Sequence, residues 1–215
     1  MPIFQLTEQP GFPDPSLAES NGLLAFGGDL TPSRLLEAYR LGIFPWYGEG
    51  DPILWWFISP RLVIYLEEFH IPRRLVRYAR NSGIEVTRNR SFKEVITACS
   101  ETRRSNGEGT WISPEMIKAY TILYKMGYAH SFECWRDGQL VGGLYGVSLG
   151  KIFFGESMFS IVKSASQLAL ISLVEYLQRR DFHLIDCQMK TAHLLRFGAR
   201  EVSRTQFQQL LTTLI

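Results

Sequence analysis

The sequence has little of what marks a secreted, membrane-spanning or metal-binding protein. Its three cysteines, Cys99, Cys134 and Cys187, are odd in number and far apart, so we expect no disulfide framework. With only four histidines in the chain, no closed metal-ligand spacing is present and no metal is expected. The start lacks the basic and apolar regions of a signal peptide. The most apolar stretch, residues 168–177, is too short to span a bilayer and contains Glu175. These absences predict a cytoplasmic protein.

An excess of charge of one sign is also lacking, because the formal net charge is only +2. The basic residues are nevertheless concentrated between residues 73 and 93. Arg73, Arg77 and Arg80 fall on one face of a predicted helix, with Arg74 beside them. Such a stripe suits the phosphate backbone of a nucleic acid. Charge alone favours the alternative, a solvated helix face whose partners lie elsewhere in the fold.

What the chain does have is the composition of a folded globular protein. Its 215 residues, 46% of them hydrophobic and 20% charged, are enough for a small lobe and a main domain. We expect the lobe at residues 1–60, built from turns and one helix, and the main domain at residues 61–215. In the lobe, Thr31 as N-cap, Pro32 in the first turn and Gly42 as terminator define the helix.

The main domain is predicted to alternate strands and helices, as in a mixed α/β fold. Asp137-Gly138 is a hairpin signal between two of its strands, and Ser91 with Glu94 is a capping box. Expected strands are 62–66, 84–87, 129–136, 139–147, 151–159 and 183–188. Expected helices are 71–80, from Ser91 to about residue 100, from Ser113 to Gly127, 163–180, 190–196 and 204–213.

From residue 84, the order of elements is that of the GNAT-like N-acyltransferases, although order alone assigns no reaction. In ordinary members, a glycine-containing turn after the fourth strand holds the pyrophosphate of coenzyme A on backbone N–H groups. The corresponding stretch here, GESMFSIVKSASQ, has no glycine after Gly155. An acyl donor other than coenzyme A is therefore expected.

Four stretches carry a more specific resemblance, which extends over nearly the whole chain. They are NGLLAFGGDLTPSRLLEAYRLGIFPW (21–46), GTWISPEMIKAY (109–120), VGGLYGVSLGKIFFGESMFS (141–160) and LIDCQ (184–188). In this order they resemble the bacterial leucyl/phenylalanyl-tRNA–protein transferases. The resemblance implies transfer of Leu or Phe, and also Met, from aminoacyl-tRNA to proteins with an N-terminal Arg or Lys. The transferred residue would mark these proteins for degradation by the N-degron pathway, with no cofactor.

The resemblance also gives a role to the aromatic, turn-rich segment GIFPWYGEGDPILWWF at residues 42–57. It implies that Trp46 and Trp111 shape the site for the 3′ adenosine and the aminoacyl group, since unpaired bases stack on aromatic rings. Trp55 and Trp56 are expected to be structural. The resemblance also implies the walls of a pocket for the donor side chain, although plain core packing explains these residues equally well. They are Leu144, Phe153, Leu170, Leu173 and Leu177.

The chemistry is implied to lie on three polar residues. Asp186 and Gln188 are two apart on a predicted strand, so their side chains would share a face. By resemblance they are the catalytic pair: Asp186 orients and polarises, and Gln188 accepts a hydrogen bond from the attacking amine. Glu156 would meet an ammonium group of the donor or acceptor. The residues alone leave another possibility, a structural network of buried acids with backbone or arginine partners.

The chain departs from the family pattern at two places, and other functions remain open. WWFISPR at residues 55–61 replaces WWSPDPR, and Arg196-Phe197 replaces Ser-Leu. One alternative is a coenzyme A-dependent N-acetyltransferase, and another is a non-catalytic RNA-binding module that uses the arginine stripe. A third is a peptidoglycan-type transferase, which takes the same class of donor but a different amine acceptor.

Overall fold

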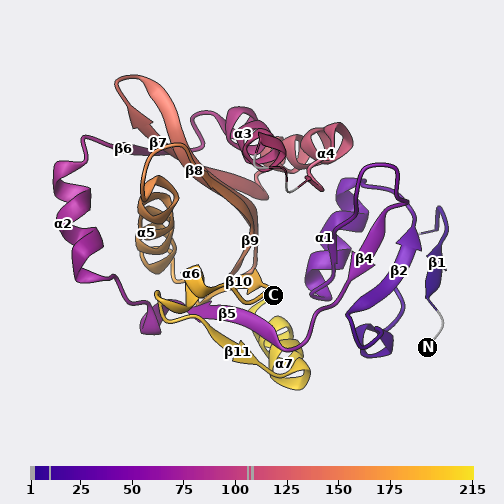
Figure 1. Ribbon diagram of the computed structural model, residues 1–215. Coiled ribbons are helices and arrows are strands. Elements are labelled where there is room, and N and C mark those ends of the chain that lie inside the picture. Colours follow the sequence, from indigo (N-terminus) through magenta and orange to yellow (C-terminus); the bar gives the residue numbers. More distant parts are fainter. Residues whose placement is uncertain (1–2, 10, 106, 108) are drawn as a thin grey trace.

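The computed structural model describes residues 3–9, 11–105, 107 and 109–215, which form two sheets with helices around them (Figure 1). The smaller sheet has the strand order β1-β2-β4-β3, and the larger has the order β11-β5-β10-β9-β8-β7-β6. The larger sheet is mixed, because β10 runs parallel to β9 and antiparallel to β5. The predicted mixed α/β fold is confirmed.

The smaller sheet corrects the expectation for the start of the chain, where we predicted only turns and one helix. Its strands have two to five residues each and are interrupted by glycine and proline, so no alternating pattern develops in the sequence. They are β1 (Phe4–Leu6), β2 (Leu23–Gly27), β3 (Phe44–Pro45) and β4 (Leu54–Trp56). The predicted helix is present as α1 (Pro32–Arg40), with Thr31 as N-cap.

The larger sheet contains every strand predicted for the main domain and one that was not. Asp137 and Gly138 both have positive φ angles, +50° and +72°, as a two-residue hairpin turn requires. The strands are β5 (Arg61–Tyr65), β6 (Glu85–Arg88), β7 (Ala129–Arg136), β8 (Gln139–Leu149), β9 (Ile152–Ser160), β10 (Leu184–Gln188) and β11 (Arg200–Val202). The short edge strand β11 was not expected.

The helices largely follow the prediction. They are α2 (Arg73–Asn81), α3 (Phe92–Ser105), α4 (Pro114–Lys125), α5 (Ala165–Gln178), α6 (Ala192–Leu195) and α7 (Arg204–Leu214). The α3 helix is longer than expected. The capping box predicted at its start is wrong, because the backbone N–H of Ser91 donates to Glu133 and not to Glu94. Short 3₁₀ turns occupy Pro15–Leu17 and Leu66–Glu68. Over the described ranges, none of the helices could cross a bilayer.

Two hydrophobic cores lie on opposite faces of the larger sheet. Consecutive residues of a strand belong to different cores: in β5, Val63 lies in the first and Ile64 in the second, and in β10, Leu184 lies in the first and Ile185 in the second. The first core, between the sheet and α1, α3 and α4, continues into the smaller sheet, and the second is covered by α5. Residues on both sides of residue 60 thus share one core. The division into lobe and main domain at that residue stays a prediction.

Gly42, at the end of α1, gives a test of how the smaller sheet is joined to the C-terminal helix. Its φ is +73°, and a Cβ there would lie 2.7 Å from Phe207 and 2.9 Å from Leu211, both on α7. We expect Gly42→Ala to lower the free energy of unfolding by about 2–4 kcal/mol, since strain and overpacking add.

Gly50→Ala is the matched control. Its φ is +87°, but a Cβ there meets nothing within 4 Å, so it should show the backbone strain alone. Urea unfolding of both variants separates the cost of backbone strain from the cost of overpacking. Equal losses of stability would contradict the packing contribution assigned to Gly42.

Candidate active site

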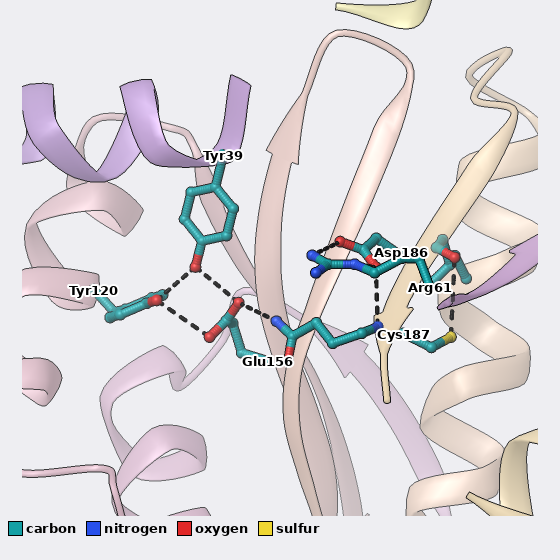
Figure 2. Close-up of polar contacts among 8 residues, drawn as sticks. Tyr39, Arg61, Tyr120, Glu156, Asp186 and Cys187 are labelled. Carbon is teal, nitrogen blue, oxygen red and sulfur yellow. Dashed lines mark hydrogen bonds and ion pairs between the residues drawn. The ribbon is translucent and has the colours of Figure 1, made fainter. Parts of the chain in front are cut away.

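Glu156 on β9 lies at the centre of a buried polar network. The pairing of β9 with β10 ends at Phe154 and Asp186, so Glu156 lies where the two strands part. Three side chains from other elements donate to its carboxylate (Figure 2). The Tyr39 hydroxyl of α1 donates to Oε1 at 2.7 Å, and the Tyr120 hydroxyl of α4 donates to Oε2 at 3.1 Å. Gln188 Nε2 also donates to Oε1, at 3.1 Å.

Burial makes Glu156 hold its proton more strongly than an ordinary carboxyl group. The two tyrosine hydroxyls also contact each other at 2.5 Å, so Tyr39, Tyr120 and the carboxyl group form a closed triangle. Burial raises the pKa of Glu156 to about 7, against the lowering effect of the two tyrosine hydrogen bonds. Burial also raises the pKa of both tyrosines well above 10, which keeps them protonated.

Asp186 has a different environment, because its charge is neutralised by an arginine. Arg61 Nε and Nη2 donate to Asp186 Oδ1 and Oδ2 at 2.8 Å and 2.6 Å, and the exposed fractions are 1% for Arg61 and 0% for Asp186. The guanidinium lies between the rings of Phe44 and Phe207, at 4.9 Å and 4.8 Å from their centroids. For Asp186, the structure therefore contains the arginine partner that the alternative interpretation anticipated.

Gln188 reaches the network by way of a β-bulge. The register between β10 and β5 shifts after Asp186, so that Cys187 is the extra residue. Gln188 has a φ of +61°, and its backbone N–H donates to Asp186 Oδ1 at 2.9 Å. The prediction that Asp186 and Gln188 lie together is consistent with this geometry. The bulge, however, means that simple strand alternation does not explain it.

The two tryptophans singled out in the sequence lie together at a large hollow. Their rings are 6.2 Å apart and perpendicular, at 90°. The hollow has a volume of about 840 Å³ and is lined by Trp46, Trp56, Trp111, Arg103 and Arg104. The guanidinium of Arg103 lies 4.0 Å from the Trp111 ring centroid. Trp55, by contrast, is fully buried.

The remaining predicted residues lie elsewhere. The expected walls of the donor pocket are all buried in the second core, on the face of the sheet opposite to Glu156, and are Leu144, Phe153, Leu170, Leu173 and Leu177. Phe153 and Leu177 also line a cavity of about 370 Å³ next to Arg88 and Tyr176. The four arginines of α2, Arg73, Arg74, Arg77 and Arg80, are exposed and form no ion pair within the part of the chain that the structure describes. Figure 1 shows α2 at the end of the molecule away from β1.

Sequence reasoning missed three side chains of the network. Tyr39 and Tyr120 lie inside the quoted motifs of residues 21–46 and 109–120, and Arg61 ends WWFISPR. All three therefore lie in stretches that carried a signal, although none of them was predicted as a site residue. Only the contacts across the fold reveal their polar role. Among the residues with described positions, no group of His, Cys, Asp and Glu side chains is arranged to hold a metal ion.

Comparisons with known proteins agree with the resemblance found in the sequence. The family described as "Leucyl/phenylalanyl-tRNA protein transferase" matches residues 63–212, and its N-terminal domain matches residues 28–57. A protein of Desulfatibacillum aliphaticivorans named leucyl/phenylalanyl-tRNA–protein transferase is 54% identical over 98% of this chain and 91% of its own length. One of Syntrophobacter fumaroxidans with the same name is 54% identical over 98% of this chain and 90% of its own.

The similarity of this chain to solved structures is much weaker. The crystal structure of an aminoglycoside acetyltransferase from an uncultured soil metagenomic sample is 11% identical, with a TM-score of 0.44. It covers 55% of this chain and 86% of its own. This overlap is too weak to support a conclusion of its own.

The raised pKa of Glu156 predicts a particular dependence of stability on pH. The native carboxyl group keeps its proton up to about pH 7, and the unfolded one loses it near 4.5, so the native state binds more protons in between. The free energy of unfolding should therefore fall as pH rises through this window, by up to about 3 kcal/mol.

The difference between wild type and Glu156→Gln in urea unfolding measures this contribution, because the other groups cancel. A difference that does not change between pH 4.5 and pH 8 would refute the assignment. Tyr39→Phe provides a second test: it removes a hydrogen bond that lowers the pKa, so the midpoint should move to higher pH.

Proposed function

The chain belongs to the leucyl/phenylalanyl-tRNA protein transferase family, and from this premise we propose that it moves Leu or Phe from aminoacyl-tRNA to proteins with an N-terminal Arg or Lys. The match of nearly the whole chain to relatives with this name carries the proposal. The products would be proteins marked for degradation by the N-degron pathway, and the site of action would be the cytoplasm.

The reaction is the aminolysis of an ester, which requires little beyond positioning. The aminoacyl ester arrives activated, and a peptide α-amine with a pKa of about 7.7–8.0 is partly neutral at cellular pH. Holding amine and ester together supplies about 7–11 kcal/mol in favourable cases. A rigid, buried network such as that around Glu156 suits this task, since its side chains are fixed by several hydrogen bonds.

We assign the 3′ end of the donor tRNA to the tryptophan hollow. Perpendicular rings of Trp46 and Trp111 offer two faces, and base stacking on such rings contributes about 1–3 kcal/mol per base. Arg103 and Arg104 line the same hollow and suit the phosphates next to the terminal adenosine. The walls proposed for the donor side chain are still Leu144, Phe153, Leu170, Leu173 and Leu177. They lie in the second core, across the sheet from Glu156, so the donor side chain would have to enter where β9 and β10 part.

For the acceptor, Glu156 is the better candidate to meet a cation. Asp186 already has a full positive partner in Arg61, so its charge is compensated. Glu156 receives only neutral donors, and its pKa of about 7 lets it release a proton when an ammonium group arrives. In this proposal Gln188 positions the attacking amine, because an amide is too weak a base to remove its proton.

Coenzyme A-dependent acetyl transfer is the less favoured function. A pyrophosphate at a helix start needs free backbone N–H groups. At the start of α5, the N–H groups of residues 165–168 donate instead to the carbonyl oxygens of Val162 and Ser164 and to the hydroxyl of Ser160. A purely RNA-binding role is also less favoured, because it leaves the buried Glu156 network without a purpose.

The first experiment mixes purified protein with radiolabelled Phe-tRNA and peptides that begin with Arg, Lys or Ala. We expect label on the Arg and Lys peptides and not on the Ala peptide. Asp186→Ala should abolish transfer, because it leaves Arg61 as an unpaired buried charge. Peptide mass identifies the product. Acetylation from acetyl-CoA with no transfer from tRNA would instead favour the acetyltransferase.

The arginines of α2 are proposed to contact tRNA phosphates. Arg77→Ala should weaken Phe-tRNA binding a few-fold and reduce the slope of log Kd against log salt by about one, since one phosphate contact is lost. Arg200→Ala is the matched control, because Arg200 is also exposed but already paired with Glu68 at 3.0 Å. Equal effects of the two substitutions would argue against a specific role of α2.

A further inference from the structure

The guanidinium of Arg61 has one buried NH₂ group, Nη1, without a partner in the described part of the chain. Its Nε and Nη2 are both bound to Asp186, but Nη1 has no hydrogen-bond partner among the described residues although it is buried. A buried donor without an acceptor is costly, and natural structures keep few of them. The free position therefore calls for an acceptor that the protein itself does not supply.

The direction of Nη1 is fixed by its surroundings. Asp186 binds one edge of the planar guanidinium, and its Cζ lies over the rings of Phe44 and Phe207, at 4.9 Å and 4.8 Å from their centroids. Figure 2 shows its free end pointing toward Glu156 and Tyr39, and Arg61 also acts on the charge of Glu156. Nη1 is thus aimed at the space beside Glu156.

Most other side-chain donors of this network are already used. The hydroxyls of Tyr39 and Tyr120 donate to Glu156, and so does one of the two hydrogens of Gln188 Nε2. A reaction centre placed here would find Nη1 of Arg61 as the charged donor group without an acceptor in the described network. Because aminolysis of an ester passes through a tetrahedral oxyanion, a fixed, charged donor is the group that the reaction needs most.

We propose that Arg61 is a catalytic residue whose Nη1 donates to the carbonyl oxygen of the aminoacyl ester and stabilises the oxyanion. The amine nitrogen forms a bond to the carbonyl carbon, and the π electrons move to the oxygen that Nη1 holds. When they return, the bond to the ribose oxygen breaks, and this oxygen takes the proton that the amine loses. The guanidinium stays protonated throughout, and Asp186 is the positioning residue that fixes it. This inference rests on the proposed function.

The test compares Arg61→Lys with wild type. Lysine keeps the positive charge but cannot bind Asp186 through two nitrogens and also present a third. We expect the single-turnover rate of transfer from Phe-tRNA to an Arg peptide to fall by about 100- to 1,000-fold, with donor affinity changed less than about threefold. Arg34→Lys is the matched control, because Arg34 is also buried, pairs with Asp29 and has an Nη1 without a partner among the described residues, but donates to Thr7 and Gln9. It should transfer at nearly the wild-type rate.

Two analogues separate stabilisation of the oxyanion from a structural role. The adenosine ester of the phosphonate analogue of phenylalanine carries a tetrahedral anion, and an amide-linked phenylalanyl-adenosine has a planar carbonyl. Arg61→Lys should weaken binding of the phosphonate by a factor close to the loss in rate, and binding of the amide hardly at all. Equal losses for both analogues, or an unchanged rate, would overturn the inference.

A double variant covers the case in which Arg61→Lys does not fold. Arg61→Met with Asp186→Leu removes both buried charges, and such replacements by apolar residues are often tolerated. It should remain folded in thermal unfolding and lack transfer and selective phosphonate binding. Transfer by the double variant at more than a tenth of the wild-type rate would overturn the inference. Absence of transfer by wild type would instead overturn the proposed function.

Discussion

The ion pair of Arg61 and Asp186 is the interaction on which the site depends. It joins β5, the first strand after the smaller sheet, to β10, and the guanidinium lies between Phe44 of the smaller sheet and Phe207 of α7. Two charges that are both almost fully buried are stable only if each compensates the other. The pair and the rings around it therefore connect β3 and β5, from the first third of the chain, to β10 and α7 near its end.

The same pair leaves Glu156 as the one carboxyl group of the described network without a cation. Neutral donors surround it, so burial outweighs hydrogen bonding and its pKa rises to about 7. Two carboxyl groups on neighbouring strands thus have different partners: Asp186 is paired with Arg61, and Glu156 is a group that can gain or lose a proton near neutral pH. A carboxyl group whose pKa is shifted by its environment is a common feature of active sites.

The parting of β9 and β10 places these groups in one site. Regular pairing stops at Phe154 and Asp186, and the bulge at Cys187 gives Gln188 a left-handed conformation. Gln188 pairs with Leu62 of β5 beyond the bulge, and its side chain bridges to Glu156 across the opening between β9 and β10. The bulge in β10 thus helps to bring the side chains of Gln188 and Glu156 together.

The sequence by itself determined the strands and helices of the main domain and the family motifs, because alternation, capping residues and the Asp137-Gly138 turn are local signals. Its motifs also identified Asp186, Gln188 and Glu156 as candidate site residues. It did not reveal the smaller sheet, whose strands are too short for a pattern, nor Arg61 and Tyr39 as members of the network. Tertiary structure alone decided those features, because the pKa of a carboxyl group and the partner of an arginine depend on contacts between residues that are more than a hundred positions apart.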